Sequence, residues 1–305
     1  MVWSVFIDGE VGTTGLQIRD RLAPRPDIRL ISLDETRRKD AGARAEAYGE
    51  ADVAILCLPD DAAREAAALA AGLPVRLIDA STAHRVDPDW VFGFAEMAKD
   101  QRAAIAGAKR VSNPGCWSTG AIGLLAPLVA AGLVAADEAL AISGVSGYTG
   151  GGKAMIAEFA SGATTGSFMY ATGQHHKHLP EIQRYAGLSR RPAFLPSVGD
   201  YDQGMVVQVA LPLGAGRSLA TLHGALADHY AGGGFVSVVG ADHYGARIHP
   251  QALNGTNRLE LSVHGDDALG VAVLVAVLDN LGKGASGAAV QNLNIMLGVD
   301  EVTGL

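Results

Sequence analysis

Residues 2–15 read Val-Trp-Ser-Val-Phe-Ile-Asp-Gly-Glu-Val-Gly-Thr-Thr-Gly, and this stretch decides the fold of the first part of the chain. The apolar run Val2–Ile7 predicts a strand, and a helical pattern follows from about Gly12 to Leu22. Glycines between a strand and a helix allow a tight turn, so that the backbone approaches a pyrophosphate whose charge sits on the helix N-terminus. An ordinary strand-to-helix turn is the alternative. The predicted cofactor-binding residues are Gly9, Gly12, Thr13, Thr14 and Gly15.

Short apolar runs alternate with helical patterns through the rest of the first third of the chain. The expected strands are Ile28–Leu33, Val53–Leu58 and Val75–Asp79. A helix is expected over Ala62–Ala71, and Asp60 and Asp61 precede it at positions suited to capping. Continuous apolar strands that alternate with helices are typical of a doubly wound parallel sheet. We therefore predict an α/β domain of the Rossmann type.

The end of the second predicted strand bears on which nucleotide the glycine loop would bind. Asp34 stands there, and Arg37, Arg38 and Lys39 follow it. An acid at this point binds a ribose 2′-hydroxyl and suits NAD, whereas basic side chains bind a 2′-phosphate and suit NADP. A solvated run of surface charges is the third interpretation. The basic cluster favours NADP, with Arg38 and Lys39 as phosphate ligands.

The pattern changes after Cys116, where longer runs with alternating polarity predict a second type of sheet. The expected strands are Ala139–Ser143, Gly204–Leu213, Phe235–Val239 and Arg258–Gly265. The apolar segment Asp267–Leu281 and the segment Ala285–Leu297 are both interpreted as helices. Such a pattern suits a mixed or antiparallel sheet with one face covered by helices.

Composition limits the class of protein. The chain has 305 residues, of which 49% are hydrophobic and 18% charged, which favours two compact globular domains. The net charge of −8 and the lack of a basic stripe argue against a nucleic-acid partner. Apolar runs such as Val271–Leu278 are too short to span a bilayer, and the N-terminus lacks the pattern of a signal peptide. We expect a cytoplasmic enzyme that acts on a small molecule.

The segment Val111–Gly120 reads Val-Ser-Asn-Pro-Gly-Cys-Trp-Ser-Thr-Gly and contains the best candidate for a nucleophile. Pro and Gly predict a turn, and a helix is expected from Cys116 through Leu125, with a kink or restart near Pro127. At a helix N-terminus the dipole and free N–H groups stabilise a thiolate and can hold an oxyanion. Cys57, inside an apolar strand, fits the usual alternative of a buried and inert cysteine.

A histidine cluster occurs in Gln174–Ile182, which reads Gln-His-His-Lys-His-Leu-Pro-Glu-Ile. In an extended segment His176 and His178 share one face, and either could exchange a proton with Cys116. Glu181 could orient that histidine or bind substrate. A zinc site is one alternative, although no second ligand group at metal spacing is evident, and a polar surface loop is another. No metal is predicted.

These segments together resemble the N-acetyl-gamma-glutamyl-phosphate reductases, and the length is similar to that of the shorter subgroup. The resemblance rests on Asn-Pro-Gly-Cys, on His-Lys-His-Leu-Pro-Glu-Ile and on the stretch Leu278–Asn292, and it extends from about Val5 to Gly298. Leu278–Asn292 is also similar to aspartate-semialdehyde dehydrogenases, which are the nearest rival. A zinc hydrolase and a nucleotide-sensing protein without catalysis are rivals from other classes.

The resemblance implies a nucleotide-binding domain of residues 1–115, completed by a C-terminal helix in 285–305. It implies a catalytic and oligomerisation domain of residues 116–284, like that of glyceraldehyde-3-phosphate dehydrogenase. It further implies NADPH, a homodimer or homotetramer, and a role in arginine biosynthesis. The implied reaction reduces an acyl phosphate to a semialdehyde through a cysteine thioester. An acetyl group or an amino-group carrier protein on the substrate would both be compatible with the sequence.

Site residues follow from the resemblance, position by position. Cys116 becomes the nucleophile, and His176, slightly preferred over His178, becomes the base. Arg85, at the end of Asp79–Arg85, becomes a bidentate ligand for phosphate, with a surface salt bridge as the alternative. The remaining substrate candidates are Asn113, Ser146 and Lys153, and the remaining cofactor candidates are Ser81, Asn280 and Gly284.

The chain departs from the longer subgroup in the run Tyr148–Gly152, which replaces a shorter glycine run, and at two single positions. Ser197 stands where the longer members have a histidine, and Gln203 stands where they have an arginine. A substrate role carried by those two residues in the longer members is therefore not transferred to this chain. The shorter subgroup shares this variation, so the predicted activity is retained.

Overall fold

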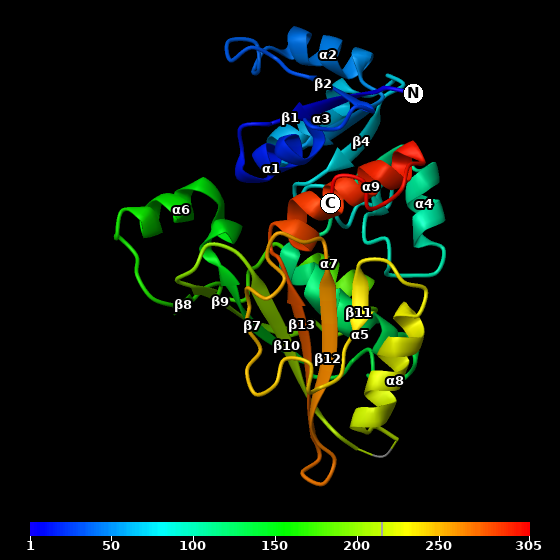
Figure 1. Ribbon diagram of the computed structural model, residues 1–305, viewed down its shortest axis with the longest axis vertical. Coiled ribbons are helices and arrows are strands. Elements are labelled where there is room, and N and C mark those ends of the chain that lie inside the picture. Colours follow the sequence, from blue (N-terminus) through cyan, green and yellow to red (C-terminus); the bar gives the residue numbers. More distant parts are fainter. Residues whose placement is uncertain (215) are drawn as a thin grey trace. The chain divides into compact units, whose positions relative to one another are not determined.

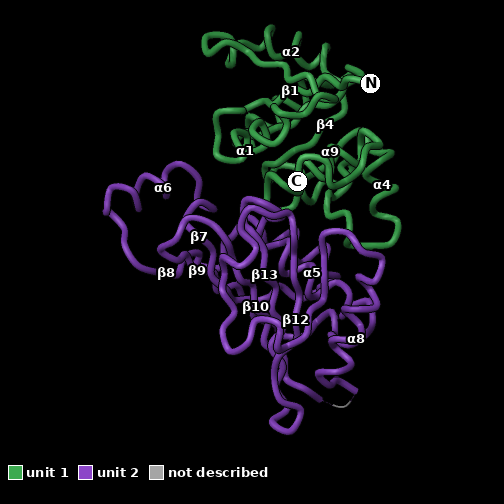
Figure 2. Tube along the Cα trace, viewed as in Figure 1, with its two compact units in different colours: residues 1–114, 285–305 green, residues 115–284 purple. Residues whose placement is uncertain are grey.

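The computed structural model describes residues 1–214 and 216–305, and it divides the chain into two compact units. Unit 1 contains residues 1–114 and 285–305, and unit 2 contains residues 115–284 (Figure 2). The chain passes from unit 1 to unit 2 after Pro114, one residue before the predicted boundary, and returns after Gly284. None of the helices in the described residues is long and apolar enough to cross a membrane.

Unit 1 is built on a parallel sheet of six strands in the order β2-β1-β3-β4-β6-β5 (Figure 1). Its strands are β1 (Trp3–Asp8), β2 (Ile28–Ile31), β3 (Val53–Leu56), β4 (Arg76–Asp79), β5 (Val91–Phe92) and β6 (Arg110–Ser112). Its helices are α1 (Thr13–Leu22), α2 (Ala41–Glu50), α3 (Asp60–Leu69), α4 (Gln101–Gly107) and α9 (Gly287–Leu297). The predicted doubly wound parallel sheet is confirmed.

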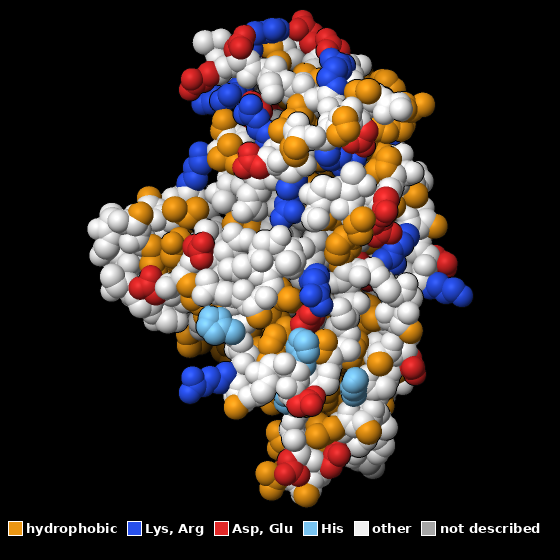
Figure 3. Space-filling view, viewed as in Figure 1, with side chains coloured by type: hydrophobic (Ala, Val, Ile, Leu, Met, Phe, Trp, Pro, Cys, Tyr) orange, Lys and Arg blue, Asp and Glu red, His pale blue; other side chains and the backbone are white. Residues whose placement is uncertain are grey.

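Two apolar clusters cover the two faces of this sheet. Val5 and Ile7 point into a cluster with side chains of α1, α4 and α9. Phe6, between them in β1, points the other way into a cluster with side chains of α2 and α3. Because successive side chains of a strand alternate between faces, a strand buried on both sides reads as a continuous apolar run. On the face drawn in Figure 3, the basic side chains of unit 1 are interspersed with acidic ones.

The predicted cap of α3 is wrong. The helix begins at Asp60 itself, with Pro59 at the N-cap position and no side-chain cap. The Asp60 carboxylate instead accepts the backbone N–H of Thr82 at 3.0 Å and also the Thr82 hydroxyl. The carboxylate that the local sequence suggests as a helix cap is therefore bound by Thr82, a residue from a distant segment.

Unit 2 is built on a mixed sheet of seven strands in the order β11-β12-β13-β10-β7-β9-β8. Its strands are β7 (Ala141–Gly147), β8 (Phe168–Met169), β9 (Ala193–Gly199), β10 (Met205–Pro212), β11 (Val236–Val238), β12 (Leu259–Asp266) and β13 (Val271–Leu278). Its helices are α5 (Cys116–Ala130), α6 (Gly152–Ala160), α7 (Leu179–Tyr185) and α8 (Leu219–Tyr230). A 3₁₀ turn covers Tyr148–Gly151, and a π-helical turn covers Gly282–Ser286.

The predicted helix over Asp267–Leu281 is wrong, because Val271–Leu278 forms β13 after a turn. Its apolar residues are continuous, so their spacing does not distinguish a buried helix from a buried strand. Alternate valines favour the strand because their branched side chains suit a pleated surface. β13 lies between β12 and β10 and contacts α5, which explains why it is apolar along its length.

Helix α5 continues through Pro127 to Ala130 rather than restarting there. Proline has no N–H for the carbonyl four residues earlier, which is that of Gly123. The Tyr230 hydroxyl of α8 donates to this Gly123 carbonyl at 2.9 Å. The missing helix hydrogen bond is thereby replaced from a neighbouring helix.

Gly120 sets how closely α5 packs on the sheet of unit 2. A Cβ at this position would lie 2.8 Å from the Cγ2 atom and 3.0 Å from the Cβ atom of Val207 in β10. Both contacts are too short for carbon atoms, so the helix or the strand would have to move. A glycine is therefore required here by packing and not by backbone conformation.

We expect Gly120→Ala to lower the free energy of unfolding by about 1–3 kcal/mol, because it overpacks the contact between α5 and β10. Urea unfolding followed by circular dichroism measures the effect. Gly224→Ala in α8 is the matched control, since a Cβ there meets nothing within 4 Å. The control should raise the free energy of unfolding by about 0.5–1 kcal/mol. Equal stability of the two variants would contradict the packing argument.

Candidate active site

Cys116 is the first residue of α5, as predicted, and its backbone is fixed through the preceding residue. Gly115 donates its N–H to Oε2 of Glu181 at 3.3 Å. The Gly115 carbonyl accepts both the N–H and the hydroxyl of Thr119, at 2.8 and 3.0 Å. Gly115 is thus held on both sides, and Cys116 follows it with its residue partly exposed.

Gly284 lies directly against Cys116. A Cβ at position 284 would come 2.7 Å from the Cβ and 3.2 Å from the Cα of Cys116. Its backbone is held there because its N–H donates to the Asp279 carbonyl at 2.9 Å. Any side chain at this position would displace the cysteine. The predicted cofactor residue is therefore a neighbour of the nucleophile.

The two predicted histidines lie together at the start of α7. Nδ1 of His176 accepts the backbone N–H of His178 at 3.2 Å, and the two rings meet edge to face with centroids 4.7 Å apart. An accepting Nδ1 carries no proton, so we assign the proton of neutral His176 to Nε2. His178 is buried, and Glu181 is 1% exposed. His176 is thereby oriented as a hydrogen-bond donor.

Aromatic side chains connect the histidine segment with the start of α5. Phe194 of β9, fully buried, contacts Trp117 at 5.3 Å and His176 at 4.8 Å between ring centroids. Tyr170 contacts His176 at 5.7 Å from the other side. These contacts bring together the segment around Gly115 and the segment around Glu181. The two residues are 66 positions apart in the sequence. Phe194 and Tyr170 were not predicted, because nothing local to their segments marks them.

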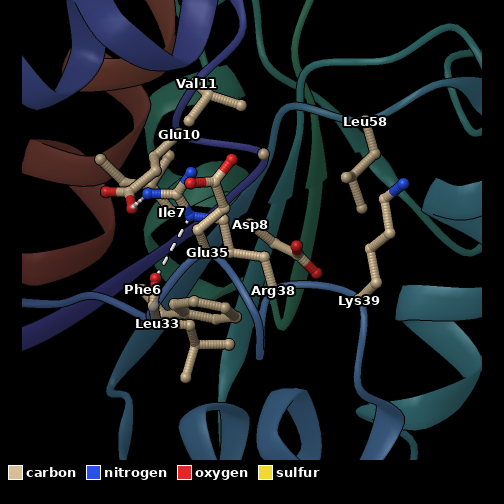
Figure 4. Close-up of a pocket in the computed structure, with 11 residues that line it drawn as sticks. Phe6, Ile7, Asp8, Glu10, Val11, Leu33, Glu35, Arg38, Lys39 and Leu58 are labelled. Atoms are coloured by element: carbon tan, nitrogen blue, oxygen red, sulfur yellow. Dashed lines mark hydrogen bonds and ion pairs between the residues drawn. The ribbon is translucent and has the colours of Figure 1, made fainter.

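A cavity of about 290 Å³ lies in unit 1 beside the glycine loop, at the carboxyl ends of the parallel strands (Figure 4). Gly9 has φ +92°, and a Cβ there would lie 2.3 Å from the Cys57 carbonyl oxygen. A Cβ on Gly15 would lie 2.5 Å from the Gly9 carbonyl oxygen. Gly12 is the N-cap of α1, and Thr13 and Thr14 form the first turn. This is the geometry in which a nucleotide pyrophosphate meets a helix N-terminus.

The predicted basic residues differ in their position at this cavity. Arg38 and Lys39 line it, whereas Arg37 pairs with Glu46 at 2.8 Å and is not among the lining residues. Arg38 extends between the Leu33 carbonyl at 3.2 Å and the Glu10 carboxylate at 3.4 Å (Figure 4). Asp34, the acid that would suit NAD, does not line the cavity either.

Three acidic residues that line the cavity were not predicted, namely Asp8, Glu10 and Glu35. Asp8 is buried, and its carboxylate accepts two bonds from Arg44 at 2.9 and 2.7 Å and one from the Tyr48 hydroxyl. Burial and the Asp8 charge raise the pKa of Tyr48, so it stays a donor. Glu10 is buried between Arg38 and Arg19. Arg44 offsets the charge of Asp8, and Arg38 and Arg19 flank Glu10, while the exposed Glu35 lies in the lining together with Arg38 and Lys39.

Ser81 and Arg85 lie on a loop of unit 1 that Asp79 holds. The Asp79 carboxylate accepts the N–H and hydroxyl of Ser81, both at 2.8 Å, and contacts Nδ1 of His84 at 2.7 Å. His84 also stacks on Trp90 with centroids 4.2 Å apart. Arg85 follows and is buried. These contacts hold the loop, and the ligand roles of Ser81 and Arg85 stay predictions.

Asn113 and Asn280 make structural contacts within their own units. The Asn113 side chain donates to the Ala285 carbonyl at 2.9 Å and accepts from Asn292 at 3.0 Å. Asn280 accepts the Gly204 N–H at 2.7 Å and donates to the Thr149 hydroxyl at 3.1 Å. These bonds anchor the loops on which both residues lie. Their predicted ligand roles stay predictions.

The other two predicted substrate residues lie near the start of α6. Ser146, buried at the end of β7, donates to the Gly147 carbonyl at 3.2 Å. Lys153 is exposed in the first turn of α6. Among the described residues, no three His, Cys, Asp or Glu side chains are grouped so that they could hold a metal ion. The zinc alternative therefore lacks a ligand set in the described part of the chain.

Cys57 directly follows β3 and, like Cys116, is only partly exposed. The pKa of its thiol is raised to about 12, first by burial and then by the charges of Asp79 and Asp8. A thiol with this pKa is almost entirely protonated near neutral pH and is a poor nucleophile. The structure thus supports the prediction that Cys57 is inert.

Two family models match the chain. Residues 32–105 match the NAD binding domain of semialdehyde dehydrogenases, and residues 116–280 match their dimerisation domain. N-acetyl-gamma-glutamyl-phosphate reductase of Mesorhizobium japonicum is 51% identical over 304 residues, which are 97% of this chain and 99% of the relative. The enzyme of that name from Brucella anthropi is 52% identical over 305 residues, or 96% and 98% of the two chains.

Solved structures share the fold at low sequence identity. Aspartate semialdehyde dehydrogenase II from Vibrio cholerae has a TM-score of 0.75 at 17% identity, and the match covers 98% of this chain and 99% of that one. Aspartate semialdehyde dehydrogenase with NADP from Candida albicans has a TM-score of 0.68 at 15% identity, covering 97% and 99%. At this identity the likeness concerns the fold alone.

We expect Arg38→Ala to raise the KM for NADPH by roughly 10- to 100-fold, because it removes a charge-assisted hydrogen bond to a 2′-phosphate. The KM for NADH should change little, since NADH has no such phosphate. Arg37→Ala is the matched control and should leave both values unchanged. Equal effects of Arg38→Ala on the two nucleotides would contradict the assignment.

Proposed function

The chain belongs to the N-acetyl-gamma-glutamyl-phosphate reductase family of semialdehyde dehydrogenases, and on this premise we propose that it uses Cys116 as its nucleophile. It reduces N-acetyl-L-glutamyl 5-phosphate to N-acetyl-L-glutamate 5-semialdehyde and phosphate in arginine biosynthesis. The observation that carries the proposal is the position of Cys116, fixed at the start of α5 through Gly115 and packed against Gly284. The cytoplasmic location stays a prediction.

The first step is attack of the Cys116 thiolate on the acyl carbonyl. The first N–H groups of a helix have no acceptor within the helix, so those of α5 favour the thiolate and the oxyanion of the tetrahedral species. The attack forms the carbon–sulfur bond, and collapse of the tetrahedral species re-forms the carbonyl, breaks the carbon–oxygen bond to phosphate and leaves a thioester. We propose Arg85 and Lys153 as ligands of the substrate phosphate, because both are cations that can donate hydrogen bonds to its oxygens.

The second step is reduction of the thioester. The glycine loop and the cavity lined by Arg38 and Lys39 fit a nucleotide with a 2′-phosphate, so we propose NADPH as the cofactor. When bound, NADPH supplies the hydride that converts the thioester on Cys116 into a thiohemiacetal. We propose that neutral His176, whose Nε2 carries the proton while Nδ1 accepts the His178 N–H, donates a hydrogen bond to the Cys116 sulfur and stabilises the thiolate that is released. The semialdehyde leaves when the carbon–sulfur bond breaks.

Glu181 has a positioning role in this scheme. Its carboxylate is buried and accepts the N–H of Gly115, the residue directly before the nucleophile. A buried carboxylate with a fixed hydrogen bond holds the turn that aims Cys116. His178 precedes α7 and supplies the backbone N–H that orients His176. Both residues therefore act through their neighbours.

Unit 2 also offers a surface for a second copy of the chain. Helices α5 and α8 pack on one face of its sheet, and the register turns Leu195, Val271 and Met169 toward the other face. These side chains are 39%, 47% and 54% exposed. Tyr244, Ile248 and Leu253 pack over another part of this face, and the part that stays exposed carries large apolar side chains, as is typical of a protein–protein contact. Because unit 2 matches a dimerisation domain, we propose that this face pairs two copies, within a homodimer or a homotetramer.

Replacement of the nucleophile tests the proposed chemistry. We expect Cys116→Ser to lower phosphate-dependent, NADP-linked oxidation of N-acetylglutamate semialdehyde by roughly a thousandfold or more, because a serine hydroxyl is not activated as a thiolate is. Aspartate semialdehyde, assayed alongside, should be a much poorer substrate of the unchanged protein.

Cys57→Ala is the matched control and should retain full activity, since the Cys57 thiol is protonated and inert. Iodoacetamide should modify the native protein once, at Cys116, as mapped by mass spectrometry. Near-normal turnover by Cys116→Ser, or modification of Cys57 in its place, would show that the nucleophile is misassigned.

A charge on the open sheet face tests the assembly. We expect Leu195→Asp to convert the oligomer into monomers in sedimentation velocity experiments, because it would bury an unpaired carboxylate in the contact. Leu269→Asp is the control, since Leu269 is 77% exposed in the turn between β12 and β13, off the sheet face. An unchanged sedimentation coefficient for Leu195→Asp would rule out this face as the interface.

A further inference from the structure

Tyr170 is a polar side chain in contact with His176 that the scheme above does not use. It directly follows β8, and its N–H donates to the Pro196 carbonyl of β9 at 3.1 Å. Its ring packs on His176 with centroids 5.7 Å apart, and the residue is partly exposed. Tyr170 is thus held at the boundary between the aromatic cluster and solvent.

The direction of the hydrogen bond at the Tyr170 hydroxyl follows from the chemistry of its partner, Trp117. The phenol oxygen makes a side-chain hydrogen bond with Trp117, the residue after the nucleophile. An indole N–H can only donate, so the Tyr170 oxygen is the acceptor and its own proton is left to donate elsewhere. A hydroxyl that accepts one hydrogen bond is polarised and becomes a better donor in the next.

The protonation state of Tyr170 suits a donor. Burial raises the pKa of its phenol, and the charge of Cys116 raises it further, while the bond from Trp117 lowers it. The phenol therefore stays protonated near neutral pH.

We propose that Tyr170 is a catalytic residue that donates a hydrogen bond to the oxygen of the tetrahedral species formed on Cys116. In both tetrahedral species this oxygen carries developing negative charge on the carbon attached to sulfur, and it is the former carbonyl oxygen of the substrate. The N–H groups of α5 supply backbone donors, and Tyr170 supplies a side-chain donor. No proton is transferred by Tyr170. The inference rests on the proposed function.

The test is Tyr170→Phe, which keeps the ring against His176 and removes only the hydroxyl. We expect kcat to fall by about 100-fold with little change in KM, because one oxyanion donor is lost in the transition state and not in the ground state. The rate at which iodoacetamide modifies Cys116 should stay at the wild-type value, since that reaction has no oxyanion. Trp117→Phe should give a smaller loss of kcat, and the double variant should be no slower than Tyr170→Phe.

Tyr230→Phe is the matched control for a structural role. It removes the hydroxyl that bonds to the Gly123 carbonyl, so it should lower the melting temperature and leave kcat unchanged. Wild-type kcat in Tyr170→Phe, or a parallel loss of iodoacetamide reactivity, would overturn the inference and leave the proposed function standing. A wild-type protein that oxidises no semialdehyde while still modified at Cys116 would instead refute the proposed function, and this inference with it.

Discussion

The chemistry of unit 2 depends on how Gly115 is held before the nucleophile. Its N–H binds the buried carboxylate of Glu181, and its carbonyl binds Thr119 within α5. The first bond ties the start of α5 to α7, and the second begins the helix at Cys116. A thiolate gains from a helix N-terminus only if it stays in the first turn, because the effect falls off within that turn. The clamp on Gly115 therefore couples the tertiary fold to the reactivity of Cys116.

A second buried carboxylate holds the opposite side of the nucleophile. Asp279 is fully buried and accepts the N–H groups of Gly255 at 2.8 Å and Leu281 at 2.9 Å, and also the side-chain amide of Gln203. A buried charge is tolerated when such donors surround it. Its backbone carbonyl fixes Gly284, which packs on Cys116. The glutamine that stands where longer relatives have an arginine is thus part of the support for this turn.

Buried carboxylates also hold side chains in place in unit 1, in this case around the cavity. Arg44 and Tyr48 hold Asp8, while Arg38 and Arg19 flank Glu10, so that buried carboxylates fix the basic side chains around the cavity. An arginine already held in place loses less side-chain entropy when it meets a phosphate. The Glu10 carboxylate, however, competes with a bound phosphate for Arg38. Preference for a phosphorylated ribose therefore depends on the balance between Glu10 and the ligand.

The sequence alone determined the features whose signal is local. Glycines 9, 12 and 15 after an apolar strand predicted the nucleotide loop, and Asn-Pro-Gly before Cys116 predicted a helix that begins at the thiol. Only the tertiary structure decided that Val271–Leu278 is a strand, because a continuous apolar run has no period to read. It also decided that Phe194, Tyr170 and Glu10 belong to sites, and that Asp60 binds Thr82. These roles arise from contacts between distant segments, and such contacts leave no pattern in the sequence around either partner.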